Sequence, residues 1–162
     1  MELLIILFLI ILNGIFSMAE IATVSARKSK LDVAAKRGDK SAKLVLETMN
    51  SPNKFLSTVQ IGITLIGILT GIFSGEKMTS DIQGFYMKFA ALKPYAHFLS
   101  VTSVVVIITF FSLVLGELVP KRIGLTNPEA IAKTMARPML IISKITAPFV
   151  WLLTVTSDLL LK

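Results

Sequence analysis

Three long apolar runs restrict what this chain can fold into. They cover about residues 3–24, 55–74 and 98–118, and each is long enough to cross the roughly 30 Å hydrocarbon core of a bilayer as an α-helix. Hydrophobic residues make up 54% of the 162 positions, more than a soluble domain of this length normally carries. The sequence therefore predicts an all-α membrane protein with three transmembrane helices.

Polar segments separate these runs. Residues 27–53 are basic and carry apolar residues at helical spacing, which predicts an amphipathic juxtamembrane helix that ends at Pro52. Residues 75–94 are mixed in character and predict a loop with a short helix or a shallow re-entrant piece. The third span is expected to stop at Pro120, and Asn127 with Pro128 is typical of a new helix start.

The tail, residues 138–162, has two interpretations. It is apolar but interrupted by Lys144, Pro148 and Asp158, so it forms either a fourth crossing or a kinked helix along the membrane interface. We favour the second. This divides the chain into a transmembrane domain, residues 1–137, and a juxtamembrane belt helix, residues 138–162.

Loop charges predict the orientation in the cell membrane. Residues 27–43 hold seven Lys or Arg against two acids, and residues 121–137 hold four against one. The intervening loop, residues 76–93, is nearly balanced, with three against two. Because cytoplasmic loops are enriched in Lys and Arg, the two basic loops belong inside. The N-terminus is then outside and the C-terminus cytoplasmic.

Several polar side chains lie inside the first predicted span. Asn13, Ser17 and Glu20 are spaced so that they share one helix face, and Ser25 falls close to that face. Such residues either form hydrogen bonds between helices or supply oxygen ligands to a hard cation. The sequence leaves both interpretations open.

The segment GELVPK, residues 116–121, combines an acid with two helix-loosening residues. Pro120 cannot donate to the carbonyl near Gly116, so backbone oxygens are freed beside Glu117. No Lys or Arg lies inside the three spans, and we therefore expect Glu117 to be cation-bound or protonated. The competing interpretation pairs Glu117 with Lys121, one turn further along.

Other functional classes find no support in the residues. The chain has no cysteine, and we find no nucleophile–base pair, zinc motif or phosphate-binding loop, so no enzyme and no organic cofactor is expected. Its net charge of +7 comes from residues that flank apolar runs without interleaved aromatics. We interpret these charges as topology signals rather than as a nucleic-acid surface.

Three motifs, in order, resemble the transmembrane domain of the CorC/CNNM (cyclin M) family of magnesium and cobalt efflux and hemolysin C-like membrane proteins. They are NGIFSMAEIA at residues 13–22, QIGITLIGIL at 60–69 and GELVPK at 116–121. The resemblance covers nearly the whole chain. It implies three transmembrane helices with a cytosolic-side helical belt, and a homodimer. It also implies a cytosolic CBS-pair module and a CorC module in full-length members, both absent from this chain.

The resemblance further implies a secondary transporter that exports divalent cations, chiefly Mg²⁺, with Na⁺ as the coupling ion. The implied site contains oxygens from all three spans: Ser17, Ser25, Thr64, Gly67, Gly116 and Glu117. Cyclin M-like members carry asparagines where this chain has Ile63 and Gly67, so two amide oxygens are missing. Some bacterial relatives with a glycine-rich second helix are thought to export polyamines, which is the alternative substrate. A membrane anchor or sensor for cytosolic regulatory modules is the alternative outside transport.

Overall fold

The computed structural model describes residues 2–160, without the side chains of residues 76, 77, 154, 157, 158 and 160. Every regular element in this part of the chain is a helix, which confirms the all-α prediction. Four segments are long and apolar enough to cross a membrane, namely Glu2–Ser25, Pro52–Gly75, Lys93–Thr126 and Pro128–Leu153. The sequence had identified the first three and left the fourth open.

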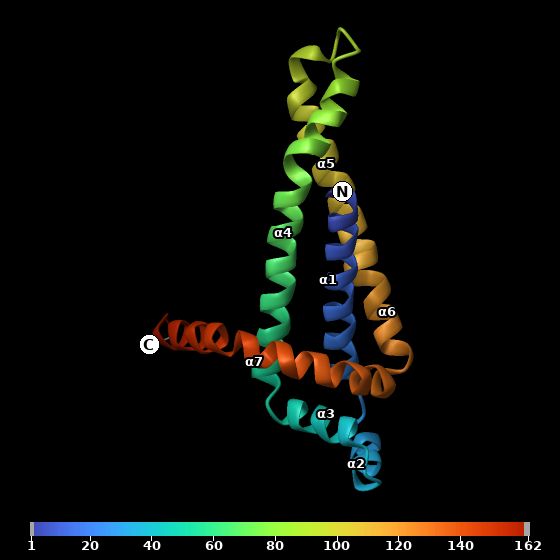
Figure 1. The fold of residues 1–162 in the computed structure, drawn as a ribbon, viewed down its shortest axis with the longest axis vertical. Helices are drawn as coiled ribbons and strands as arrows, with labels where there is room; N and C mark the ends of the chain where they lie inside the picture. The colour runs from blue at the N-terminus through green and yellow to red at the C-terminus, as the bar shows by residue number, and fades with distance from the viewer. Residues whose placement is uncertain (1, 161–162) are drawn as a thin grey trace.

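Three of these segments run side by side as a bundle (Figure 1). They are α1 (Glu2–Ser25), α4 (Pro52–Tyr86) and the column formed by α5 (Ala96–Leu113), η2 (Val114–Leu118) and α6 (Val119–Thr126). Helix α1 contacts α4 on one side and η2 with α6 on the other. We call the end where α1 finishes at Ser25 and α4 begins at Pro52 the base of the bundle.

Two of the expected boundaries were wrong. Helix α4 continues to Tyr86, so most of the predicted loop after residue 74 is helix, followed by a turn and the short 3₁₀ helix η1 (Lys93–Tyr95). The glycines there do not break the helix, and the Tyr86 and Ser103 hydroxyls lie 2.9 Å apart, joining α4 to α5. The third span does not stop at Pro120 either, because the helix passes through it by way of a π-helical turn.

The basic segment forms two short helices below the base instead of one. They are α2 (Lys28–Lys36) and α3 (Lys40–Asn50), and Gly38 between them has a φ of +92°, which favours glycine. The Asp39 carboxylate caps α3 by accepting hydrogen bonds from the backbone N–H groups of Ser41 and Ala42 at 2.9 and 3.1 Å. As expected, the helix ends before Pro52, which itself opens α4.

Helix α7 (Pro128–Leu160) lies across the base of the bundle instead of alongside the other long helices (Figure 1). It begins at Pro128 as expected, and it passes through Pro138 and Pro148 without a break in the assigned helix. It therefore starts well before the tail that we set off at residue 138. Its orientation favours the interfacial interpretation of the tail over a fourth crossing.

Two clusters of buried residues hold the helices together. One joins α1 to α4 and to Met139 of α7 through residues that include Phe16, Phe55 and Val59. The other joins the end of α1 to α2, α3 and the start of α7. Two ion pairs support the second cluster, Lys133–Asp39 at 3.0 Å and Lys30–Glu129 at 3.4 Å. Helix α7 is thus attached to both the bundle and the basic segment.

Candidate functional site

A π-helical turn interrupts the third column at Val114–Leu118. In an α-helix the N–H of residue 120 would bind the carbonyl of Gly116, but Pro120 has no N–H to donate. One residue earlier, the N–H of Val119 bonds to the carbonyl of Val114, five residues back, which is the π-helical pattern. The Gly116 carbonyl accepts a hydrogen bond from the Asn13 side-chain amide on α1 at 3.1 Å. The predicted free carbonyl is therefore present, and α1 contacts it.

Glycines allow α1 to approach this turn closely. A Cβ on Gly14 would lie 2.8 Å from Cγ of Pro120 and 2.9 Å from the carbonyl oxygen of Leu115. A Cβ on Gly116 would lie 3.1 Å from Nδ2 of Asn13. All three contacts are shorter than ordinary van der Waals distances, so a larger residue at Gly14 or Gly116 would require the neighbouring helix to shift. The close approach brings Asn13 to the π-helical turn.

Two buried oxygens on α1 have no hydrogen-bond partner in the described part of the chain. They are Oδ1 of Asn13 and Oγ of Ser17, and Ser17 is only 1% exposed. An unpaired buried polar atom costs roughly 1–3 kcal/mol, and folded proteins leave few of them. Both residues belong to the predicted polar face of α1. This face of α1 therefore carries two unsatisfied oxygens, and Asn13 also contacts the turn that carries Glu117.

Glu117 has a cationic partner, contrary to our expectation. Its carboxylate accepts a hydrogen bond from the Lys121 ammonium at 2.5 Å, one turn along the same column. The Glu117 side chain is 42% exposed and that of Lys121 36% exposed. The competing interpretation of an i, i+4 pair describes this arrangement. Lys121 lies just past the predicted end of the span, but the helix continues beyond it and keeps the two side chains one turn apart.

The other predicted residues are not gathered at this turn. Thr64 is exposed on α4. Ser25 is the last residue of α1, eight residues after Ser17, which corresponds to a rise of about 12 Å along the helix. Glu20 is half-buried and forms no ion pair with any described residue. One ion could therefore not contact both Ser17 and Ser25 while α1 stays a continuous helix.

Acidic side chains and histidine do not cluster in this region. Among the described residues, no three His, Cys, Asp or Glu side chains come together in a way that could hold a metal ion. Any cation site here would therefore depend on hydroxyl, amide and carbonyl oxygens with a single carboxylate. Such a set of oxygens, with one negative charge, suits a hard cation that keeps part of its water shell.

A cavity of about 470 Å³ lies between α1, α4 and α5. Its walls are largely aliphatic, and Asn13 is the α1 side chain that also reaches the π-helical turn. Gly67 lines this cavity, as do Thr70, Ser74 and Ser112. Thr70 and Ser74 were not among the predicted site residues. Their spacing from Gly67 nevertheless puts all three residues near one helix face. This helical spacing is the sequence signal that could have identified Thr70 and Ser74.

Comparisons with known proteins find similar chains over nearly the whole sequence. The family model described as the cyclin M transmembrane N-terminal domain matches residues 4–162. The UPF0053 protein sll0260 of Synechocystis sp. is 51% identical over 162 residues, which is all of this chain and 36% of that protein. UPF0053 protein YhdP of Bacillus subtilis is 30% identical over 161 residues, 99% of this chain and 36% of that protein.

A third relative has a name that states a substrate. The polyamine export protein of Escherichia coli strain K12 is 31% identical over 150 residues, 93% of this chain and 33% of that protein. The chain thus spans about a third of the length of these curated relatives.

Proposed function

This chain belongs to the cyclin M (CNNM) transmembrane-domain family, and from that premise we propose that it is the membrane part of a secondary transporter that exports cations. The observation that carries the proposal is the pair of buried, unpaired oxygens of Asn13 and Ser17 on α1, together with the contact of the Asn13 amide with the Gly116 carbonyl. A cation would satisfy these atoms, and otherwise they are a net loss of stability. Glu117 is the nearby acid that would supply charge.

We propose Mg²⁺ as the first candidate substrate, with Na⁺ as the coupling ion. Oxygen ligands of this kind suit hard cations, and Mg²⁺ typically keeps several waters and takes few protein ligands. Glu117 would have to leave Lys121 in order to join Ser17 and Asn13. Lys121 would then compete with the transported cation for the Glu117 carboxylate.

Two specific observations favour a polyamine as the second candidate. One is the name of the Escherichia coli relative, a polyamine export protein. The other is the cavity of about 470 Å³ next to Asn13, which is larger than a bare ion needs and has mostly aliphatic walls with a few hydroxyl groups. An elongated cation with methylene groups and terminal ammonium groups suits such walls.

Export requires the site to open alternately to the two sides of the membrane. We propose that the chain works as a homodimer and that the helices rock at the dimer interface. In a full-length protein we expect a cytosolic CBS-pair module to regulate this motion. A chain that served only as an anchor or sensor for such modules would gain nothing from unpaired oxygens inside its bundle.

The Ser17→Ala variant tests the proposal. Because Ser17 Oγ has no partner, its removal should leave the free energy of unfolding unchanged or slightly higher, while cation binding falls at least about tenfold with the loss of a ligand. The matched control is Ser100→Ala, since Ser100 is equally buried but donates to the Ala96 carbonyl at 2.5 Å. This control should retain cation binding.

Calorimetry on the purified chain with Mg²⁺, Na⁺ and putrescine measures both variants. Binding of Mg²⁺ that depends on Ser17 supports the first substrate, and binding of putrescine that depends on Ser17 supports the second. If Ser17→Ala binds every one of these cations as the unmodified chain does, the site assignment is wrong.

A further inference from the structure

Helix α7 has two different sides. Ala132, Ala136 and Met139 are buried against the bundle and the basic segment. Four apolar residues elsewhere on the helix, Ile141, Ile145, Phe149 and Leu152, are each more than half exposed and recur at helical spacing. We call these four the apolar stripe of α7. A helix that lies across the base of a membrane bundle with such a stripe is typical of a membrane surface.

Two hollows lie where α7 crosses the first turns of α4, and Lys54 lines both. The larger, about 420 Å³, is also lined by Asn53, Ser57, Ala147, Val150 and Trp151. The smaller, about 240 Å³, is also lined by Lys144, Glu47, Ser51 and Ser143, among others. Lys54 and Lys144 therefore face the junction of α4 and α7 from its two helices.

Neither lysine has a partner for its charge among the described side chains. In the described part of the chain, ion pairs involve Lys30, Lys121 and Lys133, but not Lys54 or Lys144. Glu47 lines the smaller hollow without forming an ion pair with either lysine. The larger hollow has no acid among its lining residues. An anion is therefore better accommodated in the larger hollow, with Lys54 as its main contact.

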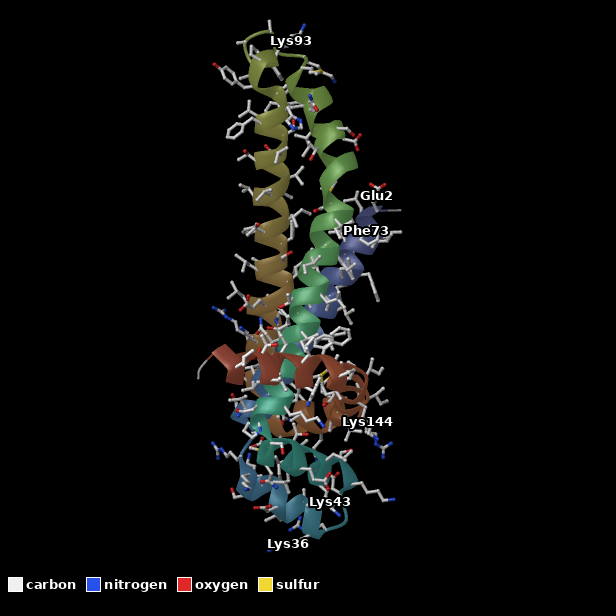
Figure 2. The ribbon with its side chains drawn as sticks, turned by 90° about the vertical axis from the view of Figure 1, so that its left-hand side faces the viewer. Glu2, Lys36, Lys43, Phe73, Lys93 and Lys144 are labelled. Atoms are coloured by element: carbon white, nitrogen blue, oxygen red, sulfur yellow. The ribbon has the colours of Figure 1, made fainter. Side chains whose placement is uncertain are left out.

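We propose that this junction binds the headgroup of an anionic phospholipid. The phosphate would lie against Lys54 with Lys144 at the rim, since basic pockets between membrane helices are suited to anionic headgroups. Trp151 lines the same hollow and is 67% exposed, and tryptophan is enriched at the level of lipid headgroups. The acyl chains would leave the hollow past the exposed ring of Trp151. Figure 2 shows Lys144 above Lys43, and Lys36 farther away at the lower end of the molecule.

The apolar wall of the larger hollow favours a lipid over a free anion. Ala147, Val150 and Trp151 supply carbon surface that a small phosphate would leave uncovered but that the glycerol and upper acyl carbons of a lipid would cover. The proposal rests on α7 lying at the membrane surface and is independent of which cation the protein transports. If the test of cation transport disproved that function, the proposed lipid site would be unaffected.

Native mass spectrometry of the 162-residue chain in detergent tests the proposal, with phosphatidylglycerol, phosphatidylcholine and glycerol phosphate as separate probes. We expect phosphatidylglycerol to bind more tightly than the other two. Lys54→Ala and Lys144→Ala should each weaken phosphatidylglycerol binding about fivefold, the effect of one basic residue near a charged lipid surface. Lys54→Arg retains the charge and should retain binding.

Lys36→Ala is the matched control, because it removes one positive charge on the same side of the bundle but away from both hollows (Figure 2). It should bind phosphatidylglycerol like the unmodified chain. An equal loss in Lys36→Ala would show a general charge effect and overturn the site. Equal binding of phosphatidylglycerol and phosphatidylcholine, or binding of glycerol phosphate as tight as that of the lipid, would overturn it as well.

Discussion

Asn13 illustrates how one side chain can join two helices and still leave an atom for a ligand. Its amide nitrogen donates to the Gly116 carbonyl at 3.1 Å, which replaces the backbone donor that Pro120 lacks. Its oxygen is buried and unpaired, like the hydroxyl of Ser17 one turn further along α1. Together the two unpaired atoms cost on the order of 2–6 kcal/mol, a large share of the stability of a typical domain. A bound cation would remove this loss, which is why we place the site here.

The pair Glu117 and Lys121 provides a second test at the scale of the residue. Glu117→Gln should reduce cation efflux to background, because it removes the only carboxylate at the π-helical turn while retaining its shape. Its stability should change by less than about 0.5 kcal/mol, since partly exposed i, i+4 ion pairs contribute little. Cation efflux from cells and thermal unfolding measure the two effects.

Lys121→Met completes this comparison. Removing the ammonium frees the carboxylate of Glu117, so we expect cation binding to become tighter. If Glu117→Gln exports cations normally, or if Lys121→Met binds them no better, the ion pair is a surface feature of the helix and Glu117 is not a ligand.

At the scale of the element, glycines have different roles in different helices. Gly14→Ala should destabilise the protein by about 1–3 kcal/mol, because its Cβ would lie within 3 Å of both Pro120 and the Leu115 carbonyl. A Cβ on Gly67 would have no neighbour within 4 Å. Gly67→Ala should therefore stabilise α4 by up to about 1 kcal/mol, because alanine has the higher helix propensity. Thermal or denaturant unfolding in detergent compares them. Equal effects would contradict the packing that we describe.

The contact between α3 and α7 should depend on pH through Asp39. Hydrogen bonds from the Ala42 N–H and the Lys133 ammonium, among other contributions, lower the pKa of Asp39 below its usual value. A carboxylate with a lowered pKa in the folded state stabilises that state above its unfolded pKa of about 4. The stabilisation is lost as the pH falls through the lower, folded pKa. The protection of the α3 amides against hydrogen exchange, relative to their intrinsic exchange rates, should therefore fall below about pH 4.

Asp39→Asn is the control for this pH dependence. Asparagine can still cap α3 but does not titrate and cannot pair with Lys133. Protection of α3 should be weaker in this variant at neutral pH and should show a smaller change on acidification. If both proteins lose protection in parallel between pH 5 and pH 2, another group controls the contact.

At the scale of the whole molecule, the basic helices and the α4–α5 turn lie at opposite ends of the bundle. Figure 2 shows Lys36 and Lys43 at one end and Lys93 at the other. The positive-inside rule predicts that the end with α2 and α3 is cytoplasmic. Because the chain has no cysteine, single-cysteine variants report on this directly. Lys40→Cys should react with an impermeant reagent only after the cells are permeabilised, whereas Lys93→Cys should react in intact cells. The reverse pattern would invert the topology.

The expected homodimer also concerns the whole molecule. Small residues of the second and third spans could pack against a partner, but the single chain already uses two of them. The ring of Phe16 occupies the space that a Cβ on Gly62 would need, and Ser103 pairs with Tyr86. Gly67 and Gly71 have open space around them. Any dimer contact through small residues of α4 is therefore expected at these two glycines.

Most helix positions could be predicted from the sequence, because lipid requires every backbone polar group to be satisfied within the helix and so imposes long apolar runs. The three spans, the helix start at Pro128 and the polar face of α1 followed from periodicity and length. Boundaries were less predictable. Tyr86 and Ser103 extend the α4–α5 hairpin, and Pro120 lies inside a helix, because contacts between helices compensate for local breaking signals.

The polar composition of the site was also readable from the sequence, since Asn13, Ser17, Gly116 and Glu117 stand out at membrane depth. Their arrangement depended on the tertiary structure. Only the packing of α1 against the π-helical turn shows that the Asn13 amide binds the Gly116 carbonyl while the Ser17 hydroxyl stays unpaired. Periodicity specifies which face of one helix a residue occupies. Which atoms of two helices meet depends on the distance and rotation between them, and here Gly14 permits the close approach to Pro120.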